Sequence, residues 1–221
     1  MIYREAIQLS NQVASLLESK RFYQAILVAC TAMEVFQKQT PTAEKASLSG
    51  HDFIDPCMAF CCNRDCASDS RSTMDEEYTY EHGIILPLNT IDWTAITAVL
   101  IFNCALTHHL AAGHCYDHVT SQHFLKKSLR LYTLAYNEQD RQDQNIMFQA
   151  AIVNNVGLIH KRLGSQEEAQ ACFDFLTTMI VMMRVSSTEG DSCLGEDKYR
   201  QHVQDFWKNI LGNKRSVAPA A

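Results

Sequence analysis

The sequence has 221 residues, of which 47% are hydrophobic and only 8 are Gly and 4 are Pro. This composition is that of a packed globular protein and excludes collagen-like, low-complexity and wholly disordered chains. The net charge of −6, from 19 Lys and Arg against 25 Asp and Glu, argues against a protein that binds nucleic acid through its phosphates.

Apolar residues recur with the 3.6-residue period of amphipathic helices in seven windows along the chain. In chain order, helices are expected over residues 2–19, 22–38, 92–112, 120–137, 146–163, 166–185 and 196–211. Gly212 is expected to end the last helix, because a glycine commonly follows a helix C-terminus. Residues 213–221 are expected to form a flexible tail.

A segment of different composition lies between the second and third windows. Residues 41–90 contain nine acidic and three basic side chains, so the whole excess of negative charge lies there. We expect residues 41–90 to be an acidic, cysteine-containing insert in a helical framework. About residues 41–77 are expected to be mobile and removable without loss of folding. Within the insert, only Tyr78–Leu88 is predicted to contain an extended piece.

Residues 150–176 contain the clearest pattern of a helical hairpin. Small Gly157 and Ala169 stand where two helices would cross, while His160 and Phe173 stand at packing positions. Small residues at a crossing let two helices approach closely, and larger residues fill the remaining gaps. The segment resembles one tetratricopeptide (TPR) repeat.

The resemblance extends to two weaker copies of the repeat. The packing residues of one copy are Ala105, Ser128 and Tyr132, and a poorer copy in residues 6–38 includes Ala25. The chain is also similar in style to helical-repeat proteins abundant in diatoms, a likeness that implies no function.

The TPR-like resemblance implies an all-α fold of antiparallel helical hairpins stacked as a short solenoid, with a long insert and a C-terminal capping helix. The expected divisions are a first degenerate hairpin, the insert, two TPR-like hairpins with the capping helix, and the tail. These cover residues 1–40, 41–90, 91–212 and 213–221, respectively.

The same resemblance implies a non-enzymatic scaffold that binds a peptide or helix of a partner protein on its concave face. Asn11, Asn103 and Asn155 recur at one repeat position on the inner face of the first helices. An asparagine amide there can both donate to and accept from a peptide backbone, so these residues are predicted to form a peptide-binding groove. The alternative is that each amide bonds a neighbouring helix and fixes the packing.

Two clusters of His and Cys support a different class, a metal-binding protein or metal-dependent enzyme. One cluster follows His51 in the insert and could hold zinc or reflect ordinary cysteine packing; it comprises Cys57, Cys61, Cys62 and Cys66. The other could bind a transition metal or lie packed between helices; it comprises His108, His109, His114, Cys115, His118 and His123. We assign no metal ligand from either cluster and expect no cofactor.

The remaining signals limit the partners and the location. Motifs of a nucleophile elbow, a phosphate-binding loop and a dinucleotide fold are missing from the sequence. Asn103, Thr107 and His108 interrupt the longest apolar stretch, and the first residues lack a secretory signal, so no membrane partner is expected. We expect a cytoplasmic or nuclear protein with a protein or peptide partner and no nucleic-acid partner. Self-association is the third option.

Overall fold

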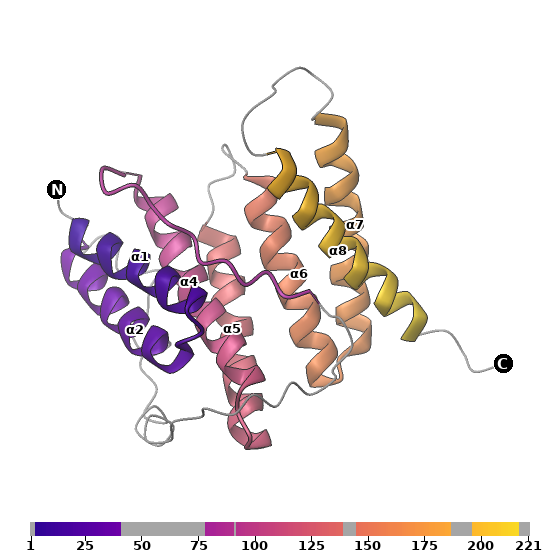
Figure 1. The fold of residues 1–221 in the computed structure, drawn as a ribbon, viewed down its shortest axis with the longest axis horizontal. Coiled ribbons are helices and arrows are strands. Elements are labelled where there is room, and N and C mark those ends of the chain that lie inside the picture. Colours follow the sequence, from indigo (N-terminus) through magenta and orange to yellow (C-terminus); the bar gives the residue numbers. More distant parts are fainter. Residues whose placement is uncertain (1–2, 41–77, 91, 139–144, 187–195, 217–221) are drawn as a thin grey trace. The chain divides into compact units, whose positions relative to one another are not determined.

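A computed structural model describes most of the chain and contains seven helices and no strand within the described residues (Figure 1). The described residues are 3–40, 78–90, 92–138, 145–186 and 196–216. The helices are α1 (Arg4–Glu18), α2 (Phe22–Gln39), α4 (Trp93–Gly113), α5 (His118–Glu138), α6 (Ile146–Leu163), α7 (Gln166–Ser186) and α8 (Glu196–Ser216). The all-α expectation is confirmed. Each expected window matches a helix to within two residues at both ends, except at the end of α8.

Local sequence explains where several helices begin and end. The Asp92 side chain accepts a hydrogen bond from the Thr94 backbone N–H at 3.0 Å, which caps the start of α4. Asn145 caps α6 in the same way through the Phe148 N–H at 3.1 Å. Gly164 ends α6 with φ of 83°, a left-handed conformation that glycine adopts without a steric penalty.

The expectation that Gly212 ends the last helix is wrong, because α8 continues to Ser216. The residue after the glycine explains the difference. Asn213 is 1% exposed and donates a hydrogen bond from Nδ2 to the Gln170 Oε1 of α7 at 2.8 Å. This contact anchors one more turn of helix against α7, which outweighs the weak helix propensity of glycine. Part of the expected tail is therefore helical.

Contacts divide the chain into two compact units. Unit 1 contains α1, α2, α4, α5 and the stretch from Glu81 into α4, while unit 2 contains Tyr78–Tyr80 with α6, α7 and α8. This division separates the two hairpins that were expected to share residues 91–212. The stacking of the hairpins as a TPR-like solenoid stays a prediction, and the expectation for residues 41–77 lies outside the described residues.

The central helix of unit 1 is α4, which packs against α1, α2 and α5. Sixteen of its 21 residues are buried, so it is apolar all around instead of on one face. It is the one described helix long and apolar enough to cross a membrane, despite the polar residues that interrupt it. A mostly buried core helix meets the same criterion, so this is weak evidence for a membrane span.

The predicted packing residues lie inside the units. In unit 1, the Ser128 hydroxyl donates to the Ala105 carbonyl at 2.8 Å, and the Tyr132 ring lies 5.6 Å from that of Phe102. Ala25 is fully buried on α2. These contacts hold α5 against α4 and leave α2 in the same core.

In unit 2, α6 and α7 approach closely at Gly157. A Cβ atom at this position would lie 3.1 Å from the Phe173 ring and 3.2 Å from the Cys172 Cβ. Ala169 is fully buried, Phe173 is 1% exposed, and His160 is half-buried. The missing side chain at Gly157 therefore lets α6 and α7 approach closely at this point.

Candidate functional site

Segment 78–88, the residues Tyr78–Leu88, is bound in two separate parts (Figure 1): Glu81–Leu88 within unit 1, which is the candidate site, and Tyr78–Tyr80 within unit 2. The segment contains neither helix nor strand. Four of its residues, all at even positions, have their backbone groups hydrogen-bonded by asparagine side chains. The prediction of an extended piece agrees with this two-residue spacing, because residues two apart in an extended chain present the same edge.

In unit 1, two asparagines bond this backbone from different helices. Asn103 of α4 accepts from the Ile84 N–H and donates to the Ile84 carbonyl, both at 2.8 Å. Asn11 of α1 accepts from the Leu86 N–H at 2.9 Å and donates to the Leu86 carbonyl at 2.8 Å. Each amide therefore satisfies both polar backbone groups of one residue.

This pairing reproduces the pattern that a neighbouring strand offers. In an antiparallel pair, one residue exchanges both its N–H and its C=O with the residue opposite, and an asparagine amide supplies the same donor and acceptor. The pairing depends on the backbone of the bound segment and makes no demand on its side chains. The Asn103 Nδ2 also donates to the Ser10 hydroxyl at 3.0 Å, which fixes the amide between α1 and α4.

Gly83 brings the segment against α1. A Cβ atom at this position would lie 2.6 Å from the Ala14 Cα and 2.7 Å from the Ala14 Cβ, closer than such atoms can approach. On the same segment Leu86 is 8% exposed, whereas Ile85 is 64% exposed. The side chains of the segment therefore differ sharply in how closely unit 1 surrounds them.

In unit 2, Asn155 of α6 accepts from the Tyr80 N–H at 2.9 Å and donates to the Tyr80 carbonyl at 3.1 Å. The Tyr78 N–H donates to the Asn209 Oδ1 at 2.8 Å. The Tyr78 carbonyl accepts from Asn209 at 2.6 Å and from Asn154 at 3.0 Å. Unit 2 thus binds the first residues of the segment by the same chemistry.

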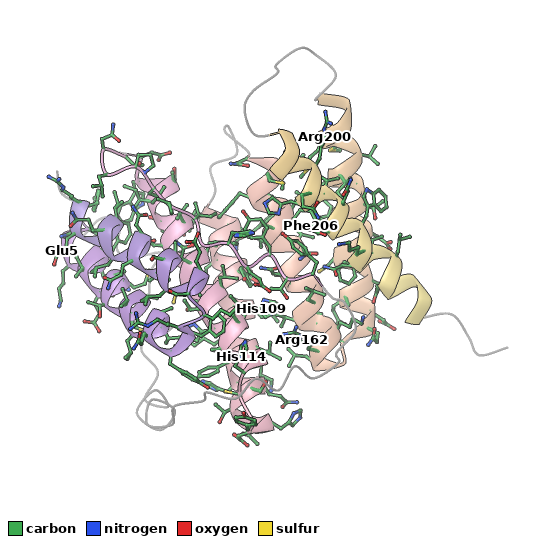
Figure 2. The ribbon with its side chains drawn as sticks, viewed as in Figure 1. Glu5, His109, His114, Arg162, Arg200 and Phe206 are labelled. Carbon is green, nitrogen blue, oxygen red and sulfur yellow. The ribbon has the colours of Figure 1, made fainter. Side chains whose placement is uncertain are left out.

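Aromatic side chains add to the binding of these first residues. The Tyr78 hydroxyl lies 2.6 Å from the His202 Nδ1, and the Tyr80 ring lies 5.1 Å from the His202 ring. Phe206, labelled on α8 in Figure 2, is fully buried with its ring 5.8 Å from that of Tyr78. Burial raises the pKa of Tyr80 above its ordinary value.

The three asparagines predicted from the repeat position all bond an extended backbone, but that backbone belongs to the chain itself. Binding of a separate peptide stays a prediction. The alternative prediction was that each asparagine bonds a neighbouring helix. Asn103 also makes a contact of this kind, because its amide donates to Ser10 of α1. Gly83 and two further asparagines, Asn154 and Asn209, also contact the segment and were not predicted from the sequence. The adjacency of Asn154 to a predicted site residue was the one available signal.

The histidine cluster is spread over several environments. His109, labelled in Figure 2, is fully buried in α4, as is His108, whose Nδ1 donates to the Cys104 carbonyl at 2.8 Å. The His114 ring stacks on Phe22 at 4.7 Å, and burial, with a smaller effect of Lys20, lowers the pKa of His114. Among the described residues, no three His, Cys, Asp or Glu side chains form a group that could hold a metal ion. The cysteine cluster of the insert lies outside these residues.

Comparisons of the chain with protein-family models, curated proteins and solved structures give no match.

Proposed function

We propose that the protein is a non-enzymatic interaction scaffold, a TPR-like array that binds an extended peptide of a partner protein through the peptide backbone. The observation that carries this proposal is the paired bonding of Ile84 by Asn103 and of Leu86 by Asn11. Two helices present matched donor and acceptor pairs at the two-residue spacing of an extended chain. Such a surface is suited to peptides in general, because every residue except proline carries the same two backbone groups.

Segment 78–88 has the character of a bound ligand. Ile85 and Leu88 are exposed, and the backbone groups of Ile84 and Leu86 are bonded by side chains. A partner peptide could form the same four hydrogen bonds in unit 1 once the segment leaves. The segment therefore acts as an internal competitor that keeps the asparagines paired when no partner is present.

The strength of this competition follows from tethering. A ligand joined to its own site by a short connection has an effective concentration on the order of millimolar. A free peptide of equal intrinsic affinity therefore binds detectably only when the internal segment binds its own site less tightly. Gly83→Val should weaken the binding of the segment to unit 1, because the added atoms would overlap Ala14 of α1. It changes none of the asparagines that form the site.

The experiment measures binding of a fluorescent synthetic peptide with the sequence of residues 81–88, the part of the segment that lies in unit 1. We expect Gly83→Val protein to bind the peptide about tenfold or more tightly than the unchanged protein does. Adding Asn103→Ala should weaken that binding by about 5- to 150-fold, which corresponds to 1–3 kcal/mol for unpaired backbone groups.

The matched control adds Asn137→Ala to Gly83→Val. Asn137 is an exposed asparagine of α5 and bonds none of segment 78–88, so its loss should leave peptide binding unchanged. Circular dichroism verifies that each variant is folded. If folded Gly83→Val protein does not bind the peptide, the segment is a fixed structural part of unit 1 and the proposal is wrong.

A further inference from the structure

We infer that the partner peptide of unit 1 carries an extended motif of glycine, an aliphatic residue, any residue and leucine. This inference rests on the proposed function and specifies its ligand. The motif is taken from the chain's own segment, in which Gly83 lies against α1, Ile84 is bonded by Asn103 of α4 and Leu86 is bonded by Asn11 of α1. The backbone bonds explain why a peptide binds, and the packing around them determines which peptides fit.

The glycine position is the most restrictive. The nearest atom to a Cβ at Gly83 is the Ala14 Cα at 2.6 Å, which belongs to the backbone of α1 and cannot move aside as a flexible side chain would. The φ of Gly83 is not positive, so the requirement is for space and not for an unusual backbone conformation. Even alanine should therefore be excluded from this position.

The leucine position is restrictive for a different reason. Leu86 is 8% exposed, so its side chain is almost fully removed from water, while Ile84 is half-buried. Burying a leucine side chain favours binding through the hydrophobic effect, and a smaller residue leaves a cavity. Ile85 between them is 64% exposed and should be replaceable.

The asparagines fix the register of these side chains. Asn103 holds the residue after the glycine, and Asn11 holds the residue three after it. A shift of the peptide by two residues would preserve the backbone bonds but place a residue with a Cβ against Ala14. The glycine therefore selects one register among those that the backbone bonds allow.

The test uses variants of the synthetic peptide of residues 81–88 with Gly83→Val protein. In the peptide, Gly83→Ala should weaken binding about tenfold or more, and Leu86→Ala should weaken it about tenfold or more. Ile85→Ser serves as the matched control and should change affinity by about twofold at most. If Gly83→Ala and Ile85→Ser peptides bind equally well, the motif is wrong while the scaffold function stands. If the parent peptide does not bind, both the motif and the proposed scaffold function are wrong.

A second measurement covers the case in which Gly83→Val protein does not fold. In the full chain, Gly83→Ala should accelerate hydrogen exchange at the Ile84 and Leu86 amides about tenfold or more, because these amides are released from Asn103 and Asn11. Ile85→Ser should leave their exchange rates unchanged. Equal rates in both variants would overturn the glycine requirement.

Discussion

Single asparagine side chains determine how segment 78–88 is held. Asn103 is 1% exposed, and its amide accepts one hydrogen bond and donates two. Asn11 makes an equivalent pair with Leu86 from a half-buried position. Asn103 is the more buried of the two and makes one more hydrogen bond, so the two residues should differ in their effect on stability.

We predict that Asn103→Ala lowers the free energy of unfolding by about 1–3 kcal/mol, because it leaves the Ile84 N–H and C=O without their partner. Asn11→Ala should cost less, since Asn11 makes two hydrogen bonds from a half-buried position, whereas Asn103 makes three from a buried one. Urea unfolding monitored by circular dichroism measures both values. Equal losses of unfolding free energy in the two variants would show that the burial of the asparagine does not determine the effect.

Sequence reasoning located the three asparagines because they share one repeat position, and a helix places such positions on a common face. It could not identify what they bind. The apolar residues of segment 78–88 are compatible with many surfaces, and the choice among them depends on packing between residues far apart in the chain. Asn209 lies in the last helix, outside the repeat pattern, and the role of Gly83 follows only from its distance to Ala14.

At the scale of the helices, the space around a glycine determines whether a larger residue can replace it. Gly157 lies where α6 and α7 cross, and added atoms there would meet the Phe173 ring. Gly212 lies inside α8 with no atom within 4 Å of an added Cβ. Both glycines therefore lie inside a helix, but a side chain at Gly157 would meet α7, whereas one at Gly212 would meet no other atom within 4 Å.

We predict that Gly157→Val lowers the free energy of unfolding by about 1–3 kcal/mol, because α7 must move or Phe173 must leave its preferred rotamer. The matched substitution Gly212→Ala should raise stability by about 0.5–1 kcal/mol, since alanine favours the helix and has room. Thermal unfolding compares the two variants with the unchanged protein. A stabilising Gly157→Val would show that the crossing is not tightly packed.

At the scale of the whole molecule, the described residues form two helical units with separate cores. The core of unit 1 is centred on α4, where Cys104 is fully buried. Burial raises the pKa of the Cys104 thiol well above its ordinary value, and the neighbouring Cys30 raises it further. Both its position and its chemistry therefore suppress reaction of this cysteine in the folded protein.

We predict that iodoacetamide modifies Cys104 only when unit 1 unfolds, whereas the half-buried Cys115 reacts in the folded protein. The rate at Cys104 should rise steeply across the urea unfolding transition, because reaction requires the thiolate and access to it. Mass spectrometry of proteolytic peptides identifies each modified residue. Rapid modification of Cys104 without denaturant would contradict the buried position of α4.

The distance along the chain between Asn11 and Leu86 has a consequence for folding during synthesis. Their hydrogen bonds join residues 75 positions apart, whereas Asn103 and Ile84 are 19 apart. Ribosomes add about 5–20 residues per second, so Asn11 waits roughly 4–15 seconds before Leu86 is made. During that interval the amide of α1 faces water or any extended nascent chain nearby. The newly made protein is therefore most open to a wrong occupant before its own segment arrives.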